Sequence, residues 1–185
     1  MKRLFDFTLA LCLVIILAPL LLVIAILIKL DSSGPAFFRQ NRVGLNGKIF
    51  SICKFRSMYV SNDPHASYNT LENDPRITRI GRVLRATSID ELPQLYNVLK
   101  GDMSIVGPRP DLELQQQDYS PEDWRLRISV RPGVTGLAQI NGRSNISFEN
   151  RLKYDLCYAR TNSFMGDLLI ILKTFVVVIR GRNTN

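Results

Sequence analysis

The first pattern along the chain is an uncharged apolar run over residues 7–28, in which only Thr8 is clearly polar. As an α-helix this run is about 33 Å long, enough to cross a hydrocarbon core of about 30 Å. Pro19 lies near its middle and has no N–H for the carbonyl four residues earlier, so we expect it to kink or break the helix. The run does not end in the small-residue cleavage site of a signal peptide, so we expect it to stay in the membrane.

Positive residues flank the apolar run on both sides, before it at Lys2 and Arg3 and after it at Lys29, Arg39 and Arg42. Because positive residues prefer the cytoplasmic side, both ends have the same preference. Each half of a helix broken at Pro19 is about 15 to 18 Å long and reaches half-way into the bilayer. We expect residues 1–30 to form a re-entrant membrane helix with both ends in the cytoplasm; a single kinked span is the alternative.

The remaining residues, 31–185, show shorter patterns that predict a small α+β domain, mainly α-helical with a minor β element. AFFRQ, residues 36–40, and KIFSICKF, residues 48–55, are the best strand candidates. Asn46-Gly47 between them favours a tight hairpin turn.

Two helical patterns and a loop pattern follow. Residues 76–88 place apolar positions at helical spacing among arginines, which predicts a short amphipathic helix whose basic face is either solvated or in contact with phosphates or lipid headgroups. Residues 90–104 continue at helical spacing until Gly101 ends the pattern. The segment RPGVTGLAQINGR, residues 131–143, is rich in Gly and Pro and predicts a shaped loop.

Near the C-terminus, residues 168–179 are strongly apolar although they contain Lys173. A helix of this length is about 18 Å long and too short to span a bilayer. We expect an amphipathic helix in the membrane interface, with Arg180 and Arg182 near lipid headgroups, or a buried core helix.

Composition and charge limit the partners and the catalytic groups that can be expected. A formal charge of +8 and a pI near 9.7 favour polyanionic partners such as nucleic acid, anionic lipid or phosphorylated substrates. Cys12, Cys53 and Cys157 lie far apart without a CxxC pair, which argues against a disulfide framework or a zinc site and favours reduced thiols. The single histidine, His65, lies in a polar segment typical of a solvated loop, which disfavours Ser-His or Cys-His catalysis.

Two adjacent carboxylates, Asp90 and Glu91, stand in the segment ATSIDELPQL. Ser88 and Glu91 match a capping box, but a helix that began at Ser88 would place Pro93 where an N–H is needed. A helix with Asp90 as its N-cap avoids this cost, so both carboxylates are expected at a helix start. These residues alone favour a helix-capping role for the pair over a catalytic one.

Cations elsewhere favour a chemical role for the pair. Arg109 lies between two prolines in GPRP, which restrains its backbone and suits bidentate phosphate binding. Lys54 and Arg56 in KFRSM, with Arg131 and Arg143 in the Gly-Pro-rich segment, add further candidates for phosphate binding. Two carboxylates among cations, without a usable histidine, suit phosphoryl chemistry with a divalent metal. Walker A, kinase and zinc-ligand motifs are absent.

Three long motifs in fixed order, KFRSM, TSIDELPQLYNVLKGDMSIVGPRP and RPGVTGLAQINGR, follow the proline-interrupted apolar run. In this arrangement the chain resembles the monotopic phosphoglycosyl transferases, a family of bacterial sugar transferases, over nearly its whole length. The resemblance implies transfer of a sugar 1-phosphate from a UDP-sugar to undecaprenyl phosphate or another polyprenol phosphate, with release of UMP. It also implies initiation of a surface polysaccharide or glycoconjugate, and a catalytic domain on the cytoplasmic face of the bacterial inner membrane.

The resemblance assigns roles to individual residues. It implies that Asp90 is the nucleophile and becomes a covalent phosphosugar ester, that Glu91 is its partner, and that the cofactor is Mg²⁺ placed with the help of Asp90. Lys54, Arg109 and Asp155 match further polar positions, and of these Arg109 is the best candidate for holding phosphate.

The chain departs from the family pattern in two places and looks like its short catalytic form. Ala18-Pro19 stands where the family often has Ser-Pro, and Ser33 stands where DSPGP is common. Some members carry additional membrane helices and a further domain before this core.

Two other functions remain as alternatives: a metal-dependent phosphohydrolase at the membrane, and a non-enzymatic basic module that binds anionic lipid. A nucleic-acid surface is not indicated, because few aromatic residues are interleaved with the basic ones. Membrane lipids are expected partners, and a homodimer stays open. The residues indicate neither the sugar nor the pathway.

Overall fold

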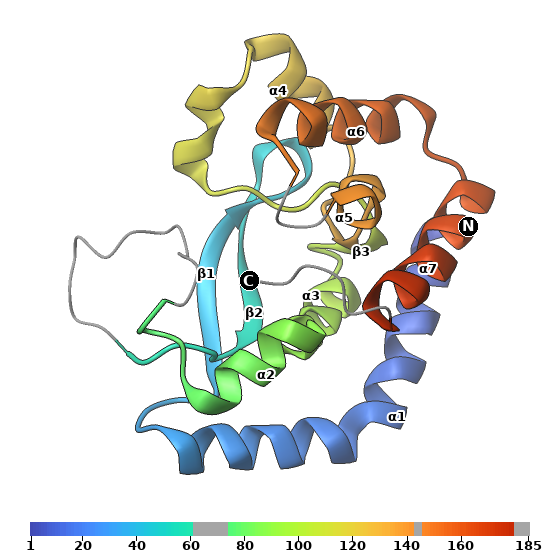
Figure 1. Ribbon diagram of the computed structural model, residues 1–185. Helices are drawn as coiled ribbons and strands as arrows, with labels where there is room; N and C mark the ends of the chain where they lie inside the picture. Colours follow the sequence, from blue (N-terminus) through green and yellow to red (C-terminus); the bar gives the residue numbers. More distant parts are fainter. Residues whose placement is uncertain (61–73, 143–145, 180–185) are drawn as a thin grey trace.

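A computed structural model of the protein describes residues 1–60, 74–142 and 146–179. Its helices and strands, in chain order, are α1 (Lys2–Asp31), β1 (Phe37–Val43), β2 (Ile49–Phe55), α2 (Arg79–Thr87), α3 (Gln94–Lys100), β3 (Ser104–Val106), α4 (Pro121–Ile128), β4 (Gly133–Thr135), α5 (Leu137–Gly142), α6 (Phe148–Thr161) and α7 (Phe164–Ile179). Short 3₁₀ turns are η1 (Leu45–Gly47), η2 (Ile89–Glu91) and η3 (Glu113–Asp118). The predicted mainly helical α+β class is confirmed (Figure 1). Four residues discussed above, His65, Arg143, Arg180 and Arg182, lie outside the described residues.

The first small sheet is the predicted hairpin. β1 and β2 pair antiparallel, with Phe37 opposite Phe55 and Val43 opposite Ile49. Asn46 and Gly47 in the connecting turn have φ values of 53° and 81°, the left-handed region that suits these two residue types. The Asn-Gly signal in the sequence therefore located the turn correctly.

The second small sheet corrects the loop prediction for residues 131–143. This segment forms strand β4, which pairs parallel with β3, and helix α5. The glycines allow this close pairing: a Cβ added to Gly133 would lie 2.1 Å from the backbone N of Gly107. Leu137 and Ile140 then pack against the core, which favours a helix after the strand. The expectation of an irregular loop was wrong because it weighed Gly and Pro above these apolar positions.

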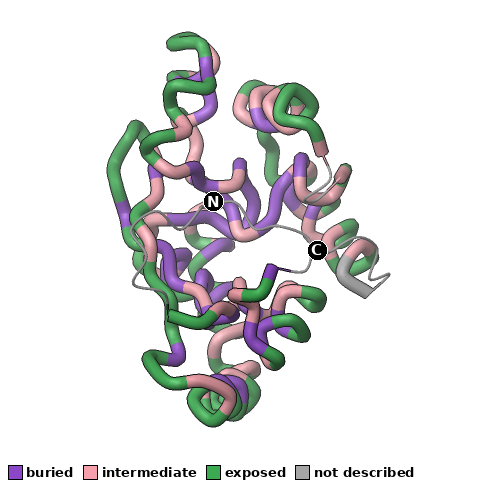
Figure 2. The backbone as a smooth tube through the Cα atoms, turned by 60° about the vertical axis from the view of Figure 1, so that its left-hand side comes forward, coloured by how far each residue is buried: buried purple, intermediate pink, exposed green. Residues whose placement is uncertain are grey.

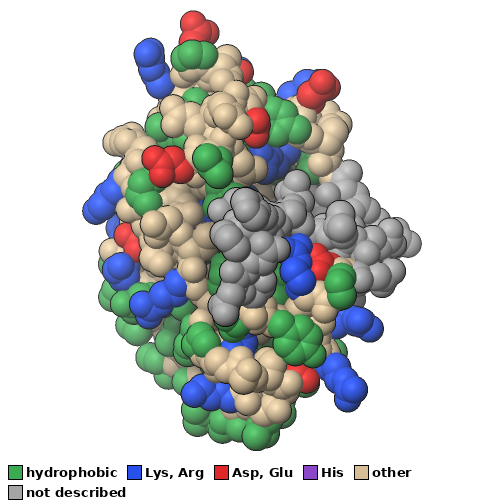
Figure 3. Space-filling model, turned by 90° about the vertical axis from the view of Figure 1, so that its left-hand side faces the viewer, with side chains coloured by type: hydrophobic (Ala, Val, Ile, Leu, Met, Phe, Trp, Pro, Cys, Tyr) green, Lys and Arg blue, Asp and Glu red, His purple; other side chains and the backbone are tan. Residues whose placement is uncertain are grey.

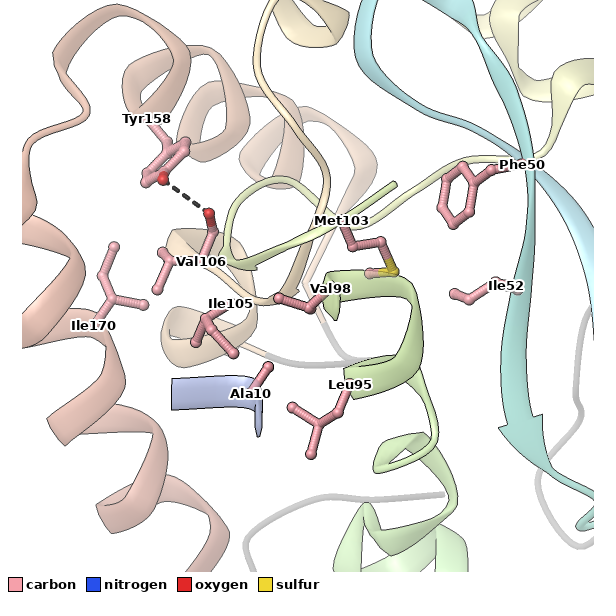
Figure 4. Close-up of a cluster of buried hydrophobic side chains, with 10 residues drawn as sticks. All are labelled: Ala10, Phe50, Ile52, Leu95, Val98, Met103, Ile105, Val106, Tyr158 and Ile170. Atoms are coloured by element: carbon pink, nitrogen blue, oxygen red, sulfur yellow. Dashed lines mark hydrogen bonds between the residues drawn. The ribbon is translucent and has the colours of Figure 1, made fainter. Parts of the chain in front are cut away.

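The main hydrophobic core joins segments from most of the chain. Figure 4 shows its ten side chains converging from α1, β2, α3, β3, α6 and α7, with a bond from the hydroxyl of Tyr158 to the carbonyl of Val106. The tube view agrees, because buried positions gather in the middle of the molecule (Figure 2). A second cluster joins the end of α1 to β2 and α2 through Ile24, Ile28, Phe55 and Leu84.

Helix α1 is a single element of 30 residues that contains Pro19, and it is visibly bent near its middle (Figure 1). Proline explains such a bend because it removes one backbone hydrogen bond and crowds the preceding turn. The helix is long and apolar enough to cross a membrane, with a mean hydropathy of 3.4 over an 18-residue window that is only 11% buried. Ile15, Ile16 and Leu22 are 64%, 71% and 64% exposed. This is far more exposure than a core helix of a globular domain would show.

Both halves of α1 are bonded to the rest of the chain. In the first half, Arg3 donates to the carbonyls of Val98 and Leu99 at the end of α3. Asp6, only 2% exposed, accepts from the hydroxyl of Ser104 at 2.8 Å and from the backbone N–H of Ile105 at 3.2 Å. These bonds attach the start of α1 to α3 and β3.

The second half is held at its C-terminal end. The buried guanidinium of Arg56 donates to the carbonyls of Ile28, Ser32 and Ser33. Asp31 accepts from the backbone N–H of Ile80 at 3.1 Å, which joins the end of α1 to the start of α2. The two ends of the apolar helix therefore contact the same domain.

Helix α7 lies beside the first half of α1 (Figure 1). Phe5 and Phe164 meet edge to face at 5.2 Å between ring centroids, and Lys2 forms an ion pair with the buried Asp167. On its outer side, α7 exposes large apolar residues, including Leu169, Leu172, Phe175 and Val176. In the space-filling view of another side, apolar side chains line the lower edge, where α1 runs, with Lys and Arg side chains near it (Figure 3).

Candidate active site

The carboxylate pair lies in a 3₁₀ turn between two helices. α2 ends at Thr87, and Ser88 adopts a left-handed φ of 58°. The turn η2 then closes through bonds from the N–H of Glu91 to the carbonyl of Ser88 and from Leu92 to Ile89. α3 begins only at Gln94, with Pro93 in its N-cap position. The predicted N-cap role of Asp90 is therefore wrong, because Pro93 starts the helix three residues later.

Glu91 is the carboxylate of the pair that accepts hydrogen bonds from basic side chains. Its Oε1 lies 2.8 Å from Nζ of Lys54 and 2.7 Å from Nη2 of Arg109, and its Oε2 accepts from Nη1 of Arg109 at 3.3 Å. Burial alone would raise the pKa of Glu91, but Arg109 and Lys54 outweigh it and hold the pKa below its usual range. Glu91 is thus an ionised carboxylate that holds two cations in place.

Asp90 has the opposite environment. It is 8% exposed, and no group in the described part of the chain donates a hydrogen bond to its carboxylate. Burial, reinforced by the charge of Glu91, raises the pKa of Asp90 to about 6, although Lys54, Arg85 and Arg109 act against this rise. A carboxylate that is shielded from water and has free oxygen lone pairs is suited to bind a cation or to attack an electrophile.

Arg85 is a site residue that sequence reasoning missed. It lies in the last turn of α2, close enough for its charge to lower the pKa of Asp90. Its Nε is buried without a partner, and no acceptor among the described residues contacts its side chain. In the sequence it was one of several arginines on an amphipathic helix. The signal that could have singled it out is its position five residues before Asp90, across a turn rather than along the helix.

Arg109 is presented by a loop anchored through its backbone. The N–H of Gly107 donates to the carbonyl of Thr135, and the N–H of Gly133 donates to the carbonyl of Pro108, both at 2.9 Å. The carbonyl of Arg109 accepts from Arg127 at 2.6 Å. The side chain of Arg109 is 43% exposed, so it can contact a ligand as well as Glu91. These hydrogen bonds anchor the backbone on both sides of Arg109.

The structure brings together only some of the predicted site residues. Lys54, Asp90, Glu91 and Arg109 form one group. Asp155 is 1% exposed and is bonded to Arg127 instead. Arg131 donates to the carbonyl of Gly101 at the end of α3.

Arg56 caps the end of α1, as described above, and does not join the carboxylate pair. Arg143 lies outside the described residues. The basic residues proposed from the sequence as phosphate ligands therefore fall into two groups. Lys54 and Arg109 lie at the carboxylate pair, whereas Arg56 and Arg131 bind backbone carbonyls elsewhere.

The residues fit a magnesium ion bound through one carboxylate. Mg²⁺ is commonly held by one or two protein carboxylates together with waters and substrate phosphates. The open carboxylate of Asp90 supplies such a ligand, whereas Glu91 is already engaged by two cations. No group of three His, Cys, Asp or Glu side chains with metal-binding geometry occurs in the part of the chain that the structure describes. A metal ion here would depend on the phosphates of a substrate for further ligands.

Comparisons with known proteins identify the family of the chain. Residues 1–181 match the family model for bacterial sugar transferases. The chain is 46% identical to a UDP-glucose:undecaprenyl-phosphate glucose-1-phosphate transferase of Caulobacter vibrioides, covering 94% of this chain and 67% of that protein. It is 44% identical to the protein of the same name from Klebsiella pneumoniae, covering 97% of this chain, and 40% identical to an undecaprenyl-phosphate galactose phosphotransferase of Salmonella typhimurium, also covering 97%. The chain spans 40% of the length of each of these last two relatives. The protein belongs to the bacterial sugar transferase family.

Proposed function

We propose that this protein transfers a sugar 1-phosphate from a UDP-sugar to undecaprenyl phosphate, with release of UMP. The observation that carries the proposal is the contrast between the two neighbouring carboxylates: Glu91 is neutralised by Lys54 and Arg109, while Asp90 accepts no hydrogen bond from any of the described residues. Relatives named for UDP-glucose and for galactose transfer support a hexose donor.

The first step is nucleophilic attack by Asp90. A carboxylate oxygen of Asp90 forms a bond to the sugar-bearing phosphorus, and the bond from that phosphorus to the bridging oxygen breaks, so that UMP leaves with the electron pair. Arg109 and Arg85 offset charge on the diphosphate, which would otherwise repel the carboxylate. The product of this step is an aspartyl phosphosugar.

The second step releases the sugar phosphate to the lipid. An oxygen of the polyprenol phosphate attacks the same phosphorus, the bond to Asp90 breaks, and the carboxylate is regenerated. Because the two substrates react in turn, a water-soluble donor and a membrane-bound acceptor can use one site. Glu91 keeps Lys54 and Arg109 in place through both steps.

We propose that Mg²⁺ is bound by Asp90 together with the diphosphate of the donor. When bound, it supplies positive charge that stabilises the charge developing on the transferred phosphate and the leaving group. Lys54 and Arg109 remain on Glu91, so they do not compete for the Asp90 oxygens.

The membrane arrangement is part of the proposal. Both ends of α1 contact one domain that contains buried charges, and the middle of the helix is exposed and apolar. We infer that α1 enters the cytoplasmic leaflet and returns, that α7 lies in the interface with its apolar side towards lipid, and that residues 31–185 face the cytoplasm. Because α1 is bent at Pro19 and each half is long enough to reach only about half-way into the bilayer, it fits a helix with both ends on one side better than a straight crossing.

The activity is tested with purified protein, undecaprenyl phosphate, Mg²⁺ and a panel of UDP-sugars beginning with UDP-glucose and UDP-galactose. UMP should appear together with a lipid-linked sugar diphosphate. Free sugar phosphate without lipid product would support a phosphohydrolase instead, and the absence of any UMP across the panel would exclude the transferase.

The role of Asp90 is tested by intact mass spectrometry. Incubation with the donor alone should add the mass of one sugar phosphate to the wild-type chain and none to Asp90→Asn, which should also lack turnover. Asp118→Asn, an exposed aspartate in η3, is the matched control and should behave as wild type. Turnover by Asp90→Asn would remove the covalent step from the proposal.

Topology is tested with single cysteines in a variant whose three native cysteines are replaced. One cysteine is placed before Lys2 and another replaces the exposed Ser33 at the end of α1. A membrane-impermeant thiol reagent should label both only when it has access to the cytoplasmic side. Labelling of the first position from the outside alone would indicate a crossing helix.

A further inference from the structure

A buried charge cluster lies behind the loop that carries Arg109. Arg127 of α4 is 4% exposed; its Nη1 lies 2.8 Å from a carboxylate oxygen of Asp111, and its Nε donates to Asp155 at 3.0 Å. Arg151 of α6 adds a second cation, 3.4 Å from the other oxygen of Asp111. Two cations and two carboxylates balance in charge, which buried groups require.

Arg127, unlike Arg151, donates a hydrogen bond to the backbone of the loop that carries Arg109. The remaining nitrogen of Arg127, Nη2, donates at 2.6 Å to the backbone carbonyl of Arg109, and no other described group donates to that oxygen. Arg151 instead donates to the hydroxyl of Tyr119 at 2.7 Å. The cluster is therefore connected to the candidate active site through Arg127 alone of these two arginines.

The backbone of the loop depends on such outside donors. Pro108 and Pro110 have no N–H, so this segment is anchored mainly by its carbonyls. The carbonyl of Pro108 accepts from the N–H of Gly133 and that of Pro110 from Arg42 at 3.3 Å, while that of Arg109 accepts from Arg127. A guanidinium offers five N–H groups in a rigid plane, so one side chain can hold two carboxylates and a carbonyl in fixed directions.

We propose that Arg127 is a positioning residue for phosphoryl transfer, which fixes the backbone of Arg109 and thereby the guanidinium that contacts Glu91. Asp111 and Asp155 act on the reaction through Arg127, as the counter-ions that orient it. Asp155, expected to bind substrate, is buried with its carboxylate on Arg127 and reaches the site only through this relay. The effect on rate rests on the proposed function, whereas the effect on the loop does not.

The kinetic test is a double-mutant cycle. Arg127→Lys keeps the positive charge between Asp111 and Asp155 but loses the planar fork, and we expect about a 10- to 100-fold loss of transfer rate, as for a displaced catalytic group. In an Arg109→Lys background the same substitution should cost less than about threefold, because its effect passes through Arg109. Equal losses in both backgrounds would overturn the proposal.

Arg151→Lys is the matched control, since Arg151 pairs with Asp111 of the same cluster but does not donate to the backbone carbonyl of Arg109. It should retain at least about one third of the activity at a similar melting temperature. Activity losses in the two lysine variants that simply follow their losses of stability would mean that Arg127 has only a structural role.

A second readout needs no substrate. Hydrogen exchange of the backbone amides in residues 106–109 should rise in Arg127→Lys and stay unchanged in Arg151→Lys, whichever reaction the protein catalyses. Unchanged exchange in Arg127→Lys would overturn the proposal even if transfer were confirmed. This separates its failure from a failure of the proposed function.

Asp155→Asn completes the design, because its amide oxygen can still accept from Nε of Arg127 and the variant should fold even if Arg127→Lys does not. Because the buried cluster loses one negative charge, the transfer rate should fall, but by less than in Arg127→Lys and with an unchanged KM for the donor. A loss as large as that of Arg109→Lys, with a raised KM for the donor, would place Asp155 on the substrate and overturn the relay.

Discussion

At the scale of single residues, the unusual feature is that one carboxylate is kept ionised by its neighbours while the adjacent one is not. Arg109 and Lys54 hold the pKa of Glu91 low, whereas burial raises the pKa of Asp90. Functional groups are commonly maintained in such unfavourable environments because the favourable interaction comes from the ligand. The consequences concern both stability and rate.

Asp90 makes the metal-free protein sensitive to pH. Its pKa rises from 3.8 to about 6 on folding, so between these values the folded chain binds more protons than the unfolded chain. The free energy of unfolding should therefore fall by about 3 kcal/mol as the pH rises from about 3 to about 7. Denaturation in detergent with a chelator, repeated across this range, measures it.

The control for this prediction is Asp90→Asn, which cannot titrate. It should lack this part of the pH dependence and should be more stable than wild type at pH 7 without metal. A wild-type profile that is flat between pH 4 and 6, or one that Asp90→Asn reproduces, would contradict the environment described for Asp90.

Arg85 should matter for the reaction more than its neighbours on α2. It is near Asp90 and has no acceptor among the described residues, whereas Arg82 is exposed to solvent. Arg85→Gln should lower kcat/KM about 100-fold, as expected when a cation facing a reacting phosphate is removed. Arg82→Gln should change it less than about twofold. Equal effects of the two substitutions would mean that α2 acts only as a basic surface.

The sequence predicted the members of the candidate site but not their separate roles. The pair Asp90 and Glu91, with Lys54 and Arg109, was found from the motifs and the cations around them. The division of labour between the two carboxylates was not, because it depends on which one the side chains from β2 and the loop reach. The N-cap prediction failed for a related reason: a 3₁₀ turn and a capped helix start share the same residue types.

The contacts of Arg127 could likewise be predicted only in part from the sequence. Arg127 stands three residues after Trp124, on the same face of α4, and both are buried. Helical spacing could have indicated this shared face. The sequence alone, however, does not show that its partners Asp111 and Asp155 come from distant segments.

At the scale of elements, the buried carboxylate of Asp6 attaches the start of α1 to β3, in addition to the ion pair between Lys2 and Asp167. Asp6 accepts from a hydroxyl and a backbone N–H. Asp6→Ala should leave both donors buried without a partner and lower the free energy of unfolding by about 2 to 3 kcal/mol. Thermal denaturation in detergent measures this loss.

Thr8→Ala, an exposed change on the same helix, serves as its control and should have little effect. Similar losses in the two variants would mean that any polar change near the start of α1 destabilises the protein. The bonds of Asp6 would then have no special importance.

The apolar run and the hairpin were the elements that the sequence predicted best, because their signals are local: hydropathy, a proline and an Asn-Gly pair. β4 and α5 were missed because their structure depends on pairing with β3, which is distant in the chain. Local composition predicts turns from Gly and Pro, but it does not predict pairing with a strand that is distant in the chain.

At the scale of the whole molecule, the exposed apolar residues of α1 and α7 lie on neighbouring helices, so both should contact lipid. Leu172 of α7 and Leu114 of η3 are 62% and 65% exposed and form a matched pair. A polarity-sensitive fluorophore on Leu172→Cys should shift to the blue on reconstitution into vesicles and be quenched by lipid-borne quenchers, while one on Leu114→Cys should not. A water-like signal from Leu172→Cys would leave α1 as the sole anchor.

The attachment of α1 also sets an order of events during synthesis. Lys2 and Arg3 bond to groups 165 and 95 positions further along the chain, and Asp6 to one 98 positions further. At about 5 to 20 residues per second, the ribosome delivers Asp167, the last of these partners, roughly 7 to 28 seconds after residue 28 has been made. During that interval the ion pair between Lys2 and Asp167 cannot form. The apolar segment can therefore reach the bilayer before its contacts with the domain are complete, and the last of these contacts can only secure an orientation that it already has.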